Sequence, residues 1–308
     1  MTTLLDMIDE VSMNLSGYTL QQDRATHITA DVAATASTIA APITLALAST
    51  DSVGKGIVEI DEELFWVDNY DRVGNTATIA PYGRAYIGTT LAAHTAGTKV
   101  TIAPTFPRFT IKRAINDTIS AIGSSIFAAN TTTITSNSAV SAFRLPATGT
   151  TLNIRNILAI AYQALGSSKE WIPIRSYRFD GNANSTAFTS GQTVSIYDYI
   201  PSGRSVQVVY ATDPTPFTTN AQEFATQTGL PESCKDLIIL GATYRLLSNL
   251  DPARAAMVSP QADETDSKRP YGSSQSLTKQ VYALFNQRLN EEVKSQQEKY
   301  PIRVHYSL

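Results

Sequence analysis

The sequence predicts an α+β fold in which a helical core of four main helices carries two inserted β modules, the second a β-sandwich. Apolar residues recur at helical spacing in four segments, and two long stretches between them alternate with the period of strands. Helical segments stand before, between and after the β stretches, so we expect the helices to come together. The expected domains are a helical core over 1–24, 105–129 and 230–308, a small β module over 25–104 and a β-sandwich over 130–229.

Four apolar stripes define the expected helices, over residues 3–20, 107–129, 231–249 and 275–299. In the second, isoleucines recur at spacings of four, four, three and four, which makes it the clearest helical pattern in the chain. These residues are Ile111, Ile115, Ile119, Ile122 and Ile126. Further along, a cap at Asp251-Pro252 predicts a short helix through Val258, and residues 260–274 are polar and predict an exposed loop.

The β stretches consist of short alternating runs separated by turn residues. Alternation at 57–60, 64–67 and 76–79 predicts the strands of the small module. The second stretch holds more such runs, and their regular spacing is typical of a sandwich. These runs are 140–145, 156–163, 171–179, 193–200 and 204–211.

The composition excludes several classes of protein. The chain has 308 residues, 43% of them apolar, a formal net charge of −3 and no basic run, so a sequence-reading DNA-binding protein is not expected. Its one cysteine, Cys234, excludes an internal disulfide and predicts a small buried residue near a helix start. No apolar run is long enough to cross a bilayer, and the first ten residues lack the basic region of a signal peptide.

Catalytic motifs, cofactor motifs and metal-ligand spacings are absent from the sequence, so we expect no enzyme, no cofactor and no metal. His94 is expected to be a hydrogen-bonding turn residue. Asp61, Glu62 and Glu63 could bind a cation, but a solvated hairpin tip is favoured, and Glu59 is expected at an ordinary strand edge. The aromatic residues of the β stretches fit core packing better than an exposed binding platform.

Residues 84–100 resemble a small β module of virion neck proteins of tailed bacteriophages. In that pattern, strands about an E-x-x-x-V element lead into R-G-x-x-G-T-x-x-x-x-H-x-x-G-T-x-V. This chain departs from the pattern at Ala85, where glycine is usual. The residues that match are Arg84, Gly88, Thr89, His94, Gly97, Thr98 and Val100.

A second resemblance links the later part of the chain to head-to-tail adaptor, or connector, proteins of the same phages. It consists of the run 206–210, Leu230-Pro231, a G-A-x-x-R-L-L segment from Gly241, and Asp251 with Arg254. The resemblance implies a homo-oligomeric ring, a dodecamer, beneath the portal protein. It further implies contacts with the next neck or tail-terminator protein and with the capsid, and passage of genomic DNA without specific binding. No membrane is expected, and the protein would be made in the host cytoplasm and reside in the virion neck.

Residues after Pro301 alternate between apolar and polar, which predicts a strand that adds to the sheet edge of a neighbouring protein. A disordered tail is the other interpretation. The residues of this expected partner-docking tail are Ile302, Arg303, Val304, His305 and Tyr306. The alternative function is a tail-associated or fibre-associated β protein that binds a ligand or carbohydrate, and an enzyme with an unrecognised site is a third.

Overall fold

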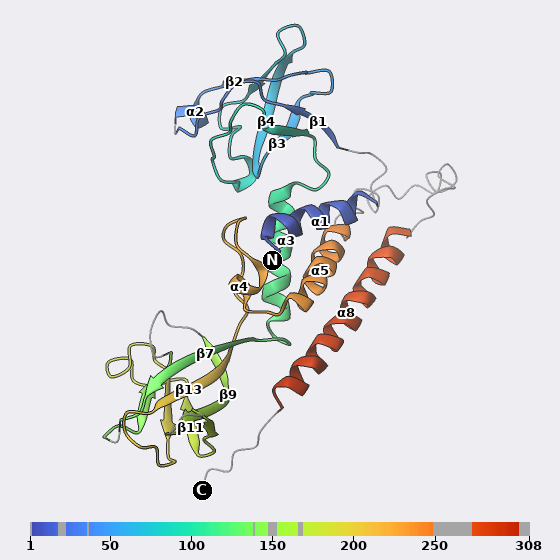
Figure 1. Cartoon of the computed structure of the whole chain (residues 1–308). Coiled ribbons are helices and arrows are strands. Elements are labelled where there is room, and N and C mark those ends of the chain that lie inside the picture. Colours follow the sequence, from blue (N-terminus) through green and yellow to red (C-terminus); the bar gives the residue numbers. More distant parts are fainter. Residues whose placement is uncertain are drawn as a thin grey trace. The chain divides into compact units, whose positions relative to one another are not determined.

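The computed structural model describes residues 2–17, 23–35, 37–137, 139–146, 153–165, 169–248 and 273–301 (Figure 1). The chain divides into two compact units. The six-stranded unit comprises residues 5–115 and 239–281, and the sandwich unit comprises residues 1–4, 116–238 and 282–308. Each unit is described by itself below.

The helices of the described residues begin and end as follows. The longer ones are α1 (Leu4–Ser16), α3 (Arg108–Ile122), α5 (Lys235–Leu247) and α8 (Ser273–Lys299). The short ones are α2 (Ser37–Ala40), α4 (Phe224–Thr228) and the 3-10 turns η1 (Tyr86–Gly88) and η2 (Glu232–Cys234). All the isoleucines of the stripe between Ile111 and Ile126 are buried. None of the described helices combines the length and the apolar composition needed to cross a membrane.

The six-stranded unit contains one antiparallel sheet in the order β1-β6-β3-β4-β5-β2. Its strands are β1 (Arg24–His27), β2 (Ile43–Ala46), β3 (Gly56–Ile60), β4 (Glu63–Asp71), β5 (Thr76–Ile79) and β6 (Lys99–Ile102). The two outer strands of this order, β1 and β2, also meet at their ends. Thr29 N donates to Ala46 O at 2.8 Å, and Ala48 N donates to His27 O at 2.9 Å. The sheet therefore closes on itself around an apolar core that includes Ile60, Phe65 and Val100.

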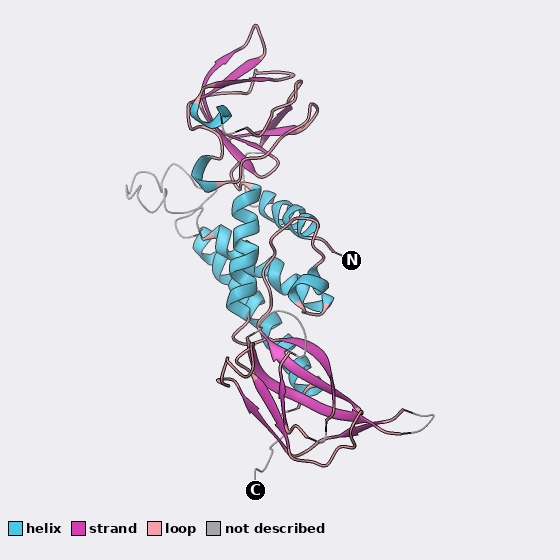
Figure 2. Ribbon diagram, turned by 90° about the vertical axis from the view of Figure 1, so that its left-hand side faces the viewer, coloured by secondary structure: helices cyan, strands magenta, loops and turns pink. Residues whose placement is uncertain are grey.

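The sandwich unit contains two antiparallel sheets that share one core (Figure 2). One has the order β10-β9-β13-β7 and the other β11-β12-β8. The strands are β7 (Ala128–Thr135), β8 (Ala142–Arg144), β9 (Ile154–Gln163), β10 (Trp171–Pro173), β11 (Tyr177–Asp180), β12 (Thr193–Ile196) and β13 (Ser205–Thr212). Side chains from both sheets, including Ile160, Val194 and Val208, fill the space between them.

The predicted fold class, a helical core of four main helices with β insertions, is wrong. In the described part of the chain, thirteen strands form three antiparallel sheets, and about 30% of the structure is helical. The apolar stripes correctly located helices. The order of helices and strands along the chain, however, does not show which of them form the core of the fold. Among the described residues, the cores of the closed sheet and of the sandwich contain no helix residue. Each β region therefore buries its apolar side chains within itself.

Ile119 lies on α3 with no exposed surface, whereas its neighbour Ser120 is exposed. Ile119→Asp places an unpaired charge in an apolar site, and we expect it to lower the free energy of unfolding by about 3 kcal/mol or more. Ser120→Asp is the matched control on the same helix and should change stability by about 0.5 kcal/mol or less. Chemical denaturation of both variants checks this, and equal midpoints for the two would contradict it.

Candidate functional site

The residues of the first motif converge on the carboxylate of Glu63, the first residue of β4, inside the six-stranded unit. The turn between β3 and β4 places Asp61 beside it, in a left-handed conformation with φ 55°. Arg84 follows β5, and His94 lies in the loop before β6, where its backbone bridges to Val32. The group is therefore assembled from segments up to 33 residues apart.

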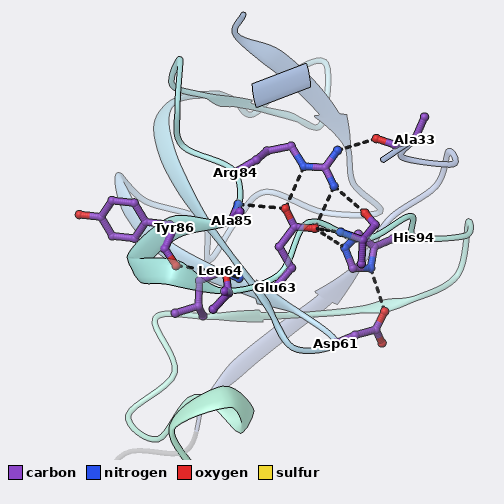
Figure 3. Close-up of polar contacts among 10 residues, drawn as sticks. Ala33, Asp61, Glu63, Leu64, Arg84, Ala85, Tyr86 and His94 are labelled. Carbon is purple, nitrogen blue, oxygen red and sulfur yellow. Dashed lines mark hydrogen bonds and ion pairs between the residues drawn. The ribbon is translucent and has the colours of Figure 1, made fainter. Parts of the chain in front are cut away.

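Glu63 receives hydrogen bonds from several directions (Figure 3). The guanidinium of Arg84 donates through Nε to Oε1 at 3.0 Å and through Nη2 to Oε2 at 2.8 Å. The backbone N–H groups of Ala85 and Ala92 each donate at 3.0 Å. His94 Nε2 lies 3.0 Å from Oε2. Burial alone raises the pKa of Glu63, but these hydrogen bonds outweigh burial and hold the pKa at about 2.

Arg84 is as deeply buried as its partner. The side chains of Arg84 and Glu63 both have no exposed surface. The guanidinium also donates to the carbonyl oxygens of Ala33 and Ala92, both at 2.6 Å, and it lies 5.1 Å from the ring centroid of Phe65. Removing one partner of such a pair typically costs about 3–5 kcal/mol, because the other charge is left buried and unpaired.

The His94 ring is held between two carboxylates. Nδ1 lies 2.8 Å from Asp61 Oδ2, and Nε2 contacts Glu63 on the opposite side of the ring. Burial by itself lowers the pKa of His94, but the hydrogen bonds to Glu63 and then Asp61 raise it above the usual 6.5. Both ring nitrogens face acceptors, so the protonated imidazolium is the form that satisfies both contacts.

The remaining motif residues shape the loops around this group. Thr89 Oγ1 accepts a hydrogen bond from Leu64 N and donates to Tyr86 O, both at 3.1 Å. Gly88 and Gly97 have φ angles of 80° and 91°, a region that glycine enters without steric cost. Val100 is buried in the core of the closed sheet. These motif residues therefore have roles in building the unit itself.

Glu59 is a second buried carboxyl group of this unit, and the prediction of an ordinary strand edge missed it. Its side chain accepts a hydrogen bond from the backbone N–H of Arg108, the first residue of α3. Burial raises the pKa of Glu59 to about 7, although the contacts with Arg108 oppose the shift. Glu59 is therefore a helix-capping group that titrates near neutral pH.

Of the other sequence predictions, some are confirmed, some are wrong and some lie outside the described residues. The expected solvated tip at 61–63 is wrong for Glu63, because its side chain is buried against Arg84. No local sequence pattern reveals this pair, since Arg84 lies 21 residues further along the chain. Glu62 forms an ion pair with Lys112 at 3.0 Å. Cys234 is buried just before α5, as predicted. The tail residues Ile302, Arg303, Val304, His305 and Tyr306 lie outside the described residues, and so does the helix predicted through Val258.

The aromatic residues divide between core and surface. Tyr210 is buried in the sandwich core, and Tyr162, Tyr177 and Phe179 pack against it. In contrast, Trp171 is 40% exposed, Tyr197 61% and Tyr199 86%. The interpretation of the aromatics as core residues therefore holds for only part of the set.

The polar groups around Glu63 are buried and bonded to one another. In the described part of the chain, no cluster of three or more histidine, cysteine, aspartate or glutamate residues is arranged to hold a metal ion. Arg84 occupies the position beside Glu63 that a cation would take. Comparisons with protein-family models and with curated proteins found no match. The geometry of this group is that of a structural support.

Stability should depend on pH through three groups. The lowered pKa of Glu63 contributes stability above about pH 4.5, which is lost as the pH falls towards 2. His94, whose pKa is raised in the folded protein, contributes its full stability below pH 6.5. This stability is lost as the pH rises from 6.5 through the raised pKa. Glu59 loses its contribution between pH 4.5 and about 7. We therefore expect the free energy of unfolding to peak near pH 4.5 and to fall towards pH 8.

Denaturation of His94→Gln and Glu59→Gln over this range separates the two contributions. Neither glutamine titrates. His94→Gln should therefore reduce the fall in the free energy of unfolding above about pH 6.5, and Glu59→Gln should reduce the fall below about pH 7. A parent protein whose stability is constant from pH 5 to 8 would show that the two groups are not perturbed in this way.

Ala85 has φ 48° and ψ 37°, a left-handed conformation that costs a residue with a Cβ about 1–2 kcal/mol. Its N–H is held by Glu63 Oε1, so the conformation cannot relax without losing that bond. Ala85→Gly removes the strain, offset in part by greater freedom of the unfolded chain, and should raise the free energy of unfolding by about 0.5–1 kcal/mol. Ala77→Gly, at a buried strand position, should instead be destabilising. A loss of stability in Ala85→Gly would contradict the argument.

Proposed function

We propose that this protein is a virion structural protein, a ring-forming head-to-tail adaptor that lies below the portal of a tailed phage. In this role it joins the capsid to the tail and lines the channel through which genomic DNA passes. Its partners are other copies of itself, the portal protein and the next neck or tail-terminator protein.

The observation that carries the proposal is that the polar side chains of the first motif bond within their own unit. Arg84, Thr89 and His94 all turn inward and bond to neighbours in the same unit. Catalysis or ligand binding requires polar groups left available in a cleft. A motif whose polar groups are already satisfied instead fits a rigid assembly part, which is what the resemblance implies.

The second motif is compatible with the same role. The run 206–210 lies within β13, Leu230-Pro231 precedes η2, and the G-A-x-x-R-L-L segment lies within α5. Asp251 and Arg254 are outside the described residues. The formal net charge of −3 also suits a channel, because DNA phosphates gain little from a surface without excess positive charge.

A second candidate function, a tail-associated or fibre-associated β protein that binds a ligand or carbohydrate, is favoured by one observation. Tyr197 and Tyr199 are exposed on either side of Asp198, in the segment after β12. Asp198 Oδ2 accepts hydrogen bonds from the backbone of Arg175 at 2.9 Å and Ser176 at 3.1 Å, which fixes the segment. Exposed aromatic rings on a fixed segment are the kind of surface on which sugars stack.

Native mass spectrometry of the purified chain, alone and mixed with portal protein, tests the proposal. We expect a closed ring with one stoichiometry, either alone or on the portal, because heterologous contacts that close give a defined number of copies. A chain that stays monomeric in both samples at all concentrations would overturn the adaptor proposal.

The double variant Tyr197→Ala/Tyr199→Ala distinguishes the two candidates. Both side chains are exposed, so the fold should be preserved. The adaptor proposal predicts that this variant still assembles, and that neither it nor the parent retains oligosaccharides on a glycan array. Binding by the parent that is lost in the variant would instead favour the carbohydrate-binding function.

A further inference from the structure

The strand β7 forms one edge of the four-stranded sheet in the sandwich unit, and among the described strands it pairs only with β13, on its inner side. Antiparallel neighbours exchange hydrogen bonds at every second residue, and the residues between point the other way. Ser136 N donates to Arg204 O at 2.7 Å, which sets the phase of this alternation. The even-numbered residues of β7 therefore bond to β13. The odd-numbered residues direct their backbone groups outward: Ala129, Thr131, Thr133 and Thr135.

Just before β7, the outward-facing backbone of Phe127 is already covered. The side-chain amide of Gln296, in α8, accepts from Phe127 N at 3.2 Å and donates to Phe127 O at 2.7 Å. One amide thus makes both bonds that an added strand would make at this position. Beyond it, within the described residues, the outward groups of the odd-numbered β7 residues have no hydrogen-bond partner.

This edge also lacks the features that usually block strand addition. Protected edges carry charged residues, proline or a bulge, or are very short. The β7 sequence is AANTTTIT, eight residues without charge or proline, and its pairing with β13 is regular throughout. Thr131, Thr133 and Thr135 are exposed. The edge is therefore a ready acceptor for another strand.

Tyr300, the residue that follows α8, lies at the start of this edge. The ring centroids of Tyr300 and Phe127 are 5.9 Å apart. Both residues, together with Ala129, line a cavity of about 350 Å³ at the start of the open edge. Residues 302–308, IRVHYSL, alternate between apolar and polar as an edge-pairing strand requires.

We propose that residues 302–308 add to the open edge of β7 of the same chain, as a fifth strand of its sheet. Tyr300 lies beside Phe127 at the start of β7, so a segment that continues from Tyr300 along this edge runs in the same direction as β7 and pairs with it in parallel. Its backbone satisfies the outward groups of the odd-numbered β7 residues.

The sequence by itself predicted that this segment docks on a neighbouring protein, whereas the position of Tyr300 favours an acceptor in the same chain. A neighbouring copy could offer the same edge to the same segment. Dependence on protein concentration separates the two arrangements, because pairing within one chain is independent of concentration and pairing between copies is not.

Amide hydrogen exchange on the full chain and on a variant lacking residues 302–308 tests the proposal. We expect the amides of Thr131, Thr133 and Thr135 to exchange at least about tenfold faster in the deletion variant. The amides of Thr132 and Ile134 bond to β13 and serve as the internal control, slow in both proteins. In the full chain, the protection should be the same across a wide range of protein concentrations.

Two substitutions within the segment sharpen the test. Val304→Pro keeps the length of the segment but restricts its backbone and removes a donor, so it should behave like the deletion. Val304→Ile keeps strand propensity and should behave like the parent. Equal exchange of the odd-numbered amides in the parent and the deletion variant would overturn the proposal. Protection that appears only as concentration rises would also overturn it, and would assign the segment to a neighbouring copy.

Discussion

The Glu63 carboxylate is the group on which the closed sheet depends, because it is charged and fully buried at the same time. Burying a charge is costly unless it is paired and hydrogen-bonded. Here Arg84, His94 and the backbone N–H groups of Ala85 and Ala92 satisfy it, and they lie on two stretches of the loop between β5 and β6, 84–85 and 92–94. The loops between β5 and β6 are consequently held in one arrangement. Ala85, one of the left-handed residues in these loops, is held by one of these bonds, from its N–H to Glu63.

The two β regions manage their sheet edges in opposite ways. The six-stranded sheet closes through bonds between the ends of β1 and β2, so no long edge remains. In the sandwich, the described residues leave the outer side of β7 unpaired, and Gln296 covers only Phe127 just before it. An unpaired edge of this length invites association, so natural proteins cover it or use it. This contrast places the proposed strand pairing in the sandwich unit.

An assembly role accords with the way polarity is distributed. The polar side chains around Glu63 bond to one another inside the six-stranded unit. Exposed apolar and aromatic side chains such as Val73, Tyr82 and Tyr199 stand instead on the surfaces of both units.

The sequence by itself determined what depends on local pattern. Isoleucine spacing located α3, although this helix ends at Ile122 and not at residue 129, and alternation located most strands. It missed β7, whose threonine-rich run shows no alternation, and it misjudged the fold class, because strand partners and sheet closure join distant segments. Only the tertiary structure could reveal that Glu63 is buried. Its partner Arg84 lies 21 residues away, and the desolvation that makes the pair matter exists only once the sheet has closed.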